Sequence, residues 1–183
     1  MSQFTRQFTR QTTTARLLMA ALLIAGASVG GAAQAAAATA TSSATVVAPI
    51  AITKVADLTF GRFAAATGGS VTVSTSGVRT VGGAVIGLTG SASTAARFDV
   101  TGDSGASYSI ALSGTTVLTS GANTMPFAPV SDLTGAGAIT GNVTTGTLTA
   151  GASSIFVGGV LTVASAQAPG SYSGTVIATV EYN

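Results

Sequence analysis

The chain has 183 residues, of which 24 are glycine, 7% are charged and 5% are aromatic, and it contains no histidine, cysteine or tryptophan. These absences remove the side chains on which most nucleophilic, acid–base and soft-metal chemistry depends. With 46% hydrophobic residues the chain is too apolar for an intrinsically disordered protein, so a packed fold is expected.

The first 35 residues have the pattern of a secretory signal peptide. Arginines without any acid precede an apolar run over residues 17–29, and Ala33, Gln34 and Ala35 match a small-residue cleavage site. The run is shorter than the roughly 20 residues that span a bilayer. Cleavage after Ala35 leaves a mature chain, residues 36–183, with no membrane span and a destination in the periplasm, at the cell surface or outside the cell.

Cleavage also changes the charge. The whole sequence carries a net charge of +2, whereas the mature chain keeps four cations and five acids, a net charge of −1. Four scattered cations cannot neutralise a row of phosphates, which excludes nucleic acid as a partner. Without cysteine, an exported fold of this kind is held by burial and sheet hydrogen bonds rather than by disulfides.

The mature chain begins with small residues, and a segment whose side chains alternate between two faces follows. Residues 36–43 carry no large apolar side chain and predict a flexible or weakly extended segment. From residue 44 to residue 53 side chains alternate with a period of two, which predicts a strand. Pro49 lacks a backbone donor and places this strand at a sheet edge or breaks it in two. One face of the strand carries Val46, Ala48, Ile50 and Ile52.

Short β-branched runs then recur about every ten residues between Gly, Ser, Asn and Asp, which is typical of a sandwich or barrel. Residues 71–75 and 78–81 flank a Ser-Gly turn and predict a hairpin. Residues 97–101 and 107–112 flank a short loop and are predicted to pair, and the pair Gly158 and Gly159 predicts a bulge or a bend. Further strands are predicted at residues 58–60, 84–88, 115–119, 123–127, 147–149, 154–157 and 160–163.

The last strand is predicted at residues 172–182, with even-numbered residues on one face. Residues 131–146 are interpreted as a long loop within one domain. No window after the signal has helical spacing, so the expected fold is all-β over residues 36–183. The predicted core includes Phe60, Phe98, Tyr108, Ile110 and Val180.

No constellation of residues predicts a catalytic or metal site. A Ser-Lys pair would need Lys54, the one lysine, but position 51 holds alanine where the motif needs serine. Paired carboxylates lack the aromatic platforms of a sugar cleft. Asp99 and Asp103 bracket a glycine-containing turn, where Asp commonly caps its own backbone. We therefore expect no enzyme activity and no cofactor.

Two segments carry a family resemblance. Residues 57–63 read DLTFGRF, and residues 170–183 read GSYSGTVIATVEYN. Together with intermediate pieces they resemble the DUF4402 family of exported bacterial proteins over nearly the whole mature chain. The same landmarks are more remotely similar to the spore coat protein U family, which includes pilins of archaic chaperone-usher pili. That similarity implies an incomplete immunoglobulin-like antiparallel β-sandwich, which the N-terminal segment of the next subunit completes.

Two functions of different classes follow. The first is an exported structural or surface-assembly protein, a fimbrial-like subunit that uses β-strand addition, with itself or related subunits and a periplasmic chaperone as partners. Its donor positions are Val46, Ala48, Ile50 and Ile52, and its acceptor or C-terminal strand positions are Val176, Ala178, Val180 and Tyr182. The second is a complete sandwich, a monomeric periplasmic or secreted binding module for a glycan or small ligand. The oligomeric state of the mature chain distinguishes the two.

Overall fold

The computed structural model describes residues 35–183, and the chain divides into two compact units, Met1–Ser43 and Ala44–Asn183. All strands lie in the second unit, and the described residues contain no helix. The sequence prediction of an all-β chain is therefore confirmed for this part. The predicted signal peptide lies outside the described residues.

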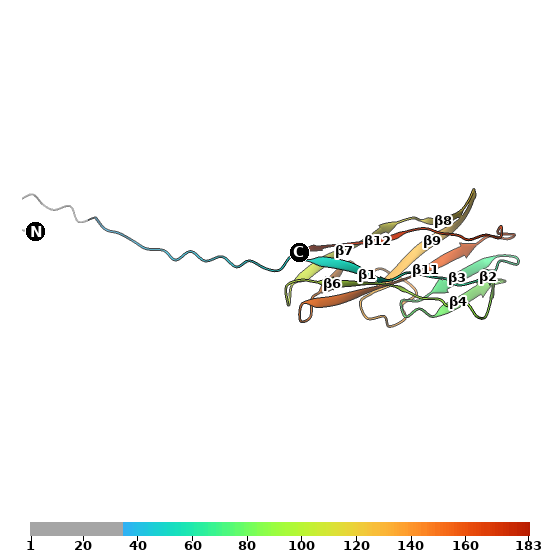
Figure 1. Ribbon diagram of the computed structural model, residues 1–183, viewed down its shortest axis with the longest axis horizontal. Helices are drawn as coiled ribbons and strands as arrows, with labels where there is room; N and C mark the ends of the chain where they lie inside the picture. Colours follow the sequence, from blue (N-terminus) through green and yellow to red (C-terminus); the bar gives the residue numbers. More distant parts are fainter. Residues whose placement is uncertain (1–34) are drawn as a thin grey trace, which may run out of the picture. The chain divides into compact units, whose positions relative to one another are not determined.

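The larger sheet has seven antiparallel strands built around one long strand, β11 (Figure 1). One edge of β11 pairs with β6 and then β3, and the other edge pairs with β9. β1 lies outside β6, β4 outside β3, and β8 outside β9. The strands are β1 (Ala51–Ala56), β3 (Gly69–Val73), β4 (Arg79–Gly83), β6 (Ala96–Thr101), β8 (Val117–Ser120), β9 (Asn123–Asp132) and β11 (Ala152–Val163).

A three-stranded antiparallel sheet forms the second layer, in the order β10-β7-β12. Its strands are β10 (Thr145–Thr147), β7 (Ser107–Gly114) and β12 (Val176–Tyr182). Figure 1 shows β7 and β12 above β1 and β6. A two-stranded sheet of β2 (Phe63–Ala64) and β5 (Ile86–Gly87) closes the other end of the domain.

Two hydrophobic clusters fill the space between the layers. Near β6, β7 and β12 the cluster is built on side chains that include Phe98, Tyr108 and Ile155. Near β3 and β9 it is built on side chains that include Phe60, Phe127 and Leu161. Large apolar residues at alternate strand positions supply both clusters, as the period of two predicts.

The core prediction holds for Phe60, Phe98, Tyr108 and Ile110, which are all buried, but not for Val180. Val180 is half-buried, because β12 pairs with β7 on one edge and with no strand of the described chain on the other. An edge strand leaves part of each inward side chain uncovered.

Two pairing predictions differ from the structure. The hairpin β3–β4 forms as predicted, but β6 and β7 do not pair with each other. Their inward side chains meet face to face in one cluster, so the two strands belong to opposite layers. The pair Gly158 and Gly159 forms no bulge within β11; a Cβ there would strike the Val73 carbonyl or the Phe127 ring, so close packing explains both glycines.

Candidate functional site

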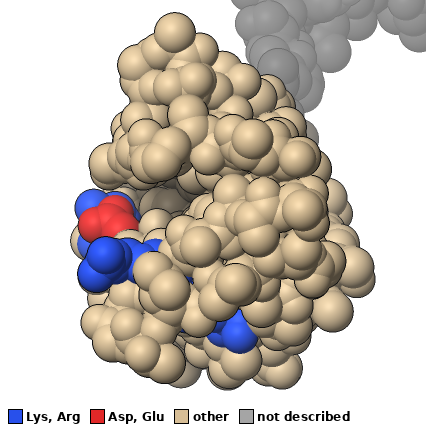
Figure 2. Space-filling view, turned by 90° about the vertical axis from the view of Figure 1, so that its right-hand side faces the viewer, with Lys and Arg blue, Asp and Glu red and all other residues tan. Residues whose placement is uncertain are grey.

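A groove of about 1100 Å³ opens between the chain that follows β1 and the chain that precedes β12. One wall is residues 54–65, and the other is residues 167–176. Figure 2 views the end of the domain where the groove opens and shows basic side chains, with an acidic one among them, beside a hollow. Two free strand edges and a hollow between them make this the strongest candidate for a binding site.

Four apolar side chains from separate parts of the chain form the floor of the groove: Phe60, Met125, Phe127 and Leu161. The rings of Phe60 and Phe127 meet edge to face, with centroids 6.0 Å apart. Each floor side chain is 9% exposed or less. The floor is therefore already packed, and the open space lies above it, between the walls.

The first wall is held in place by Arg79, a residue of β4. Its guanidinium donates hydrogen bonds to the carbonyls of Phe60 and Arg62, both at 3.1 Å, and to the carbonyl of Leu88 at 2.9 Å. Gly61 lies between the first two carbonyls with φ of +71°, and a Cβ there would strike the guanidinium. The Gly-Arg step of the DLTFGRF motif thus gives the wall its bend.

The second wall is organised by Tyr172. Its hydroxyl donates to the carbonyl of Ala168 at 2.8 Å and accepts a hydrogen bond from the Gln167 amide at 2.7 Å. Behind this wall, Ser173 and Thr119 exchange both backbone hydrogen bonds. The wall is therefore a continuation of β12 that lies alongside β8.

The backbone of the second wall leaves one edge free. Ser173, Thr175 and Asn183 make backbone hydrogen bonds to the β7–β8 side. Because hydrogen-bonding direction alternates along a strand, the N–H and C=O groups of the even-numbered residues point to the opposite edge. On the first wall, Thr59 exchanges both bonds with Thr94, so the groups of Leu58 point away from Thr94. The groove can therefore offer strand hydrogen bonds from both walls.

Charges gather at the rim of the groove. Lys54 donates to Asp57 at 2.7 Å, and both side chains are largely exposed. Arg62 lies exposed on the same wall. An exposed pair of this kind contributes little to stability, and the rim has no more than one excess positive charge.

The two carboxylates with shifted pKa values lie outside the groove. The Ser154 hydroxyl and the Arg97 guanidinium donate to Asp99 and hold its pKa below the ordinary value, against the opposing effect of burial. Burial alone would raise the pKa of Asp132, but hydrogen bonds from the Thr75 hydroxyl and the N–H groups of residues 134–136 outweigh it and lower the pKa. Neither environment suits a general acid, which requires a raised pKa.

Between β1 and β12 the groove continues as a seam, the line where these two strand edges face each other without backbone pairing in the described chain. Val176, one predicted acceptor position, lines the groove. The predicted acceptor positions Ala178, Val180 and Tyr182 are half-buried beside the seam, against the cluster that contains Phe98. All four share the inward face of β12, as the alternation predicts.

The predicted donor positions separate into two pairs. Ile52 lies in β1, and Ile50 directly precedes it; both are half-buried against the domain's own core. Val46 is 96% exposed, and Ala48 is also exposed in a segment without strand structure. The segment that is available to a partner therefore ends before Ile50, and residues 36–47 are called the leader below.

Ala48 is fastened to the C-terminal strand. The Tyr182 hydroxyl donates to the Ala48 carbonyl at 2.8 Å and accepts a hydrogen bond from the Asp103 N–H at 2.7 Å. Tyr182 therefore fixes the point where the leader joins the domain.

A family profile described as domain of unknown function (DUF4402) matches residues 50–182. The chain belongs to the DUF4402 family. No curated protein and no solved structure matches the chain. The DUF4402 region begins two residues after Ala48 and includes both walls and the floor of the groove. The leader precedes it.

The sequence reading missed several residues of the groove in this DUF4402 protein. Met125 and Leu161 lie in predicted strands, but nothing local shows that they share a floor with Phe60. Arg79 is 9, 17 and 19 residues from the three carbonyls that it binds. The one sequence signal for this contact was Gly61 inside the DLTFGRF motif. A glycine next to buried aromatic residues indicates a backbone conformation that favours glycine and a close approach by another part of the chain.

The described chain offers neither a metal cluster nor a membrane-crossing helix. Residues 35–183 contain no group of three or more His, Cys, Asp or Glu side chains placed to hold a metal ion. Within the same residues, no helix has the length and apolar character needed to cross a bilayer.

Proposed function

We propose that this DUF4402 protein is an exported structural or surface-assembly subunit, fimbrial-like, that joins its partners by β-strand addition in the groove. The observation that carries the proposal is the pair of free strand edges, β1 with its continuation and β12 with its continuation, separated by a hollow over a packed apolar floor. An added strand would pair with these edges and fill the open space between the walls. The partners are itself or related subunits and a periplasmic chaperone.

The low charge of the mature chain also supports an assembly role. A chain rich in β-branched residues usually protects its edges with charge. β12 carries a single charged residue, Glu181, and β1 carries Lys54 alone. Edges with so little protection favour pairing with another strand.

Size-exclusion chromatography with light scattering on residues 36–183, exported to a periplasm, tests the proposal. Unheated gel electrophoresis of the same sample should show a ladder that collapses on heating, because strand-exchanged subunits separate when they unfold. Deletion of residues 36–47 should abolish the ladder and spare β1, which begins at Ala51. A stable monomer under all conditions would overturn the proposal.

The second candidate is a monomeric periplasmic or secreted module that binds a glycan or small ligand. The size of the groove favours it, because about 1100 Å³ is similar to the volume of small-molecule sites. In that case a ligand should raise the melting temperature of the monomer. The outcome that separates the two functions is a ligand-stabilised monomer rather than a heat-sensitive ladder.

A further inference from the structure

We infer that the two ends of the domain form an electrostatic contact between copies, in which the end that carries Arg62 and Arg79 docks on the end of the next copy that carries Asp103 and Glu181. The inference rests on the proposed function. It adds a contact outside the groove, made by charged side chains, that sets the direction and the rate of assembly.

Most charges of the described chain are already compensated. Lys54 forms an ion pair with Asp57, and Arg97 forms one with Asp99. The Asp132 carboxylate is held by N–H groups of its own loop, residues 134–136. Four charged side chains have no ion-pair partner within residues 35–183: Arg62, Arg79, Asp103 and Glu181.

The two unpaired cations lie together at the groove end. Arg62 is exposed on the first wall. The Arg79 guanidinium donates a hydrogen bond to the Arg62 carbonyl at 3.1 Å, and its other partners are two carbonyls and a hydroxyl. Such oxygens satisfy the N–H donors but carry no full negative charge. This end therefore keeps two uncompensated positive charges, and Figure 2 shows its basic side chains beside the hollow.

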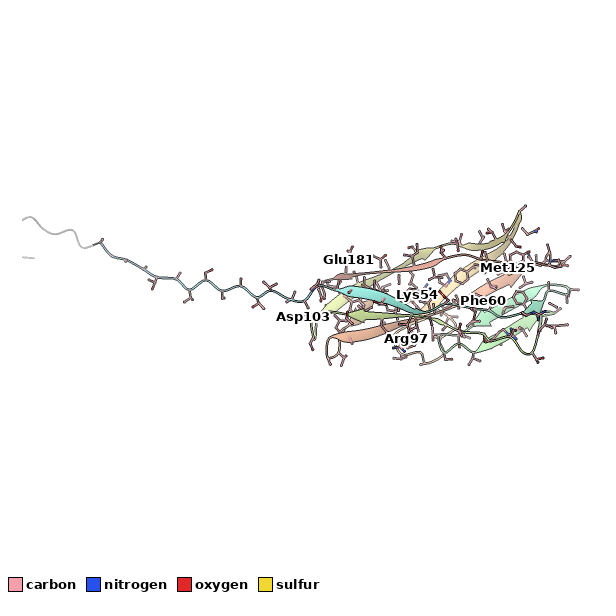
Figure 3. All side chains as sticks on the ribbon, in the orientation of Figure 1. Lys54, Phe60, Arg97, Asp103, Met125 and Glu181 are labelled. Atoms are coloured by element: carbon pink, nitrogen blue, oxygen red, sulfur yellow. The ribbon has the colours of Figure 1, made fainter. Side chains whose placement is uncertain are left out.

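The two unpaired acids lie together at the other end. Asp103 is in the turn between β6 and β7, where its N–H donates to the Tyr182 hydroxyl. Glu181 precedes Tyr182 in β12 and is exposed. Figure 3 shows Asp103 and Glu181 at one end of the domain and Phe60 toward the other. The domain is therefore positive at the groove end and negative at the opposite end.

The strand register gives the separation of these charges. Thr101, two residues before Asp103, pairs with Ala152 in β11. Val73 pairs with both Arg79 and Gly159. The seven residues from 152 to 159 span about 23 Å at about 3.3 Å per residue. The Debye length is about 8 Å in physiological salt, so the two ends do not neutralise each other within one copy.

A second copy of the domain supplies both complementary surfaces. Two like ends repel each other and two unlike ends attract, so the charges favour a head-to-tail arrangement. A contact between unlike ends leaves one free end of each kind and can repeat into a filament. Exposed ion pairs add little to stability, whereas complementary potentials speed encounter. The contact should therefore act on the rate of assembly and on its dependence on salt.

Three single substitutions in residues 36–183 test the inference. Arg62→Glu cancels the charge of the groove end, Glu181→Lys cancels that of the other end, and Ser104→Asp adds a third acid beside Asp103. Heat-dissociated samples are cooled at about 0.01 M or about 1 M salt, where the Debye length is about 30 Å or about 3 Å. Light scattering follows the return of the polymer.

At low salt Arg62→Glu and Glu181→Lys should each assemble about fivefold more slowly than the unaltered chain, and Ser104→Asp about twofold faster. At high salt the three rates should equal that of the unaltered chain. All three positions are exposed, so the melting temperature of the dissociated form should not change.

The variants also separate end-to-end attraction from repulsion by net charge. From a net charge of −1, Arg62→Glu gives −3, Ser104→Asp gives −2 and Glu181→Lys gives +1. Net repulsion would slow Ser104→Asp and leave Glu181→Lys unchanged, which is the opposite of the result expected here.

The inference and the proposed function fail on different results. If the unaltered chain forms polymer but the variants assemble at its rate at low salt, or if Ser104→Asp is slower, the end-to-end contact is wrong and the proposed function stands. Differences that persist undiminished at high salt would also contradict the contact. If the unaltered chain forms no polymer, the proposed function fails, and this inference fails with it.

Discussion

Tyr108 and Tyr182 face each other across β7 and β12, and their hydroxyls have opposite environments. The Tyr108 hydroxyl is buried without a hydrogen-bond partner in the described chain, and its ring packs against Gly146. The Tyr182 hydroxyl makes two hydrogen bonds, to Ala48 and from Asp103. A buried polar group without a partner destabilises a fold, whereas a satisfied one does not.

Tyr108→Phe should therefore raise the free energy of unfolding by about 1 kcal/mol, because it removes an unsatisfied hydroxyl and keeps the ring. Tyr182→Phe, its matched control, should lower it by about 1 to 2 kcal/mol through the loss of two bonds. Urea titrations of both variants measure the difference. A loss of stability in Tyr108→Phe would mean that the hydroxyl has a partner.

Asp132 gives the fold a pH dependence at acid pH. Its pKa is lowered in the folded chain, so the stability that it contributes is present above the unfolded pKa of about 3.9 and is lost as pH falls through the folded value. Asp132→Asn should lower stability at pH 7 and flatten this acid dependence, as urea titrations between pH 7 and 3 would show. An unchanged acid slope in the variant would contradict the assignment.

Thr75 supplies the matched control for this site. Its hydroxyl donates to Asp132 at 2.5 Å and accepts hydrogen bonds from the N–H groups of Gly137 and Ala138. Thr75→Val should cost about 1 to 3 kcal/mol, and Thr75→Ser much less because it keeps the hydroxyl.

At the scale of strands, existence was easier to predict than pairing. Alternation located the final strand and its inward face, and the Ser-Gly turn located the β3–β4 hairpin. The partner of β6 was missed because nearness in sequence favoured β7, whereas packing placed the two strands in opposite layers. Pairing depends on contacts between distant residues, and one sequence contains no local signal for them.

For the groove, too, positions within a strand were easier to predict than contacts between distant segments. Val176 was predicted on the acceptor side from the remote family resemblance together with the alternation of its strand, and it lines the groove. Ile50 and Ile52, predicted as donor positions, are half-buried against the domain's own core. A period of two does not distinguish a strand that is given to a neighbour from one that is kept. The wall held by Arg79 depends on a contact across two strands and a turn, which no spacing rule detects.

Phe60 links the first wall to the floor of the groove. Phe60→Ala should cost about 3 to 5 kcal/mol, because it leaves a cavity beside Phe127. Phe60→Leu, its control, keeps most of the volume and should cost less than about 1.5 kcal/mol. Thermal or urea unfolding measures both, and a loss below about 1 kcal/mol for the alanine variant would contradict the buried placement.

At the scale of the whole molecule, the domain does not depend on its leader. The strands and both clusters lie in Ala44–Asn183, and the leader residues are exposed, although Val47 is only 51% exposed. A chain of residues 48–183 should therefore have a free energy of unfolding within about 0.5 kcal/mol of that of residues 36–183, as expected for a change away from packed features. Calorimetry of dilute monomer measures this, and a large loss of stability would mean that the leader packs on its own domain.

β11 has a consequence for the rate of folding. It is the common partner of β3, β6 and β9, yet it is the second-to-last strand in the chain. During synthesis, which starts at the N-terminus, β3, β6 and β9 lack their common partner until residues 152–163 have been made. A fold dominated by such distant pairings forms in milliseconds to seconds, and its apolar segments stay exposed until then. The late position of β11 therefore leaves unpaired strand edges and apolar segments exposed in the unfinished chain.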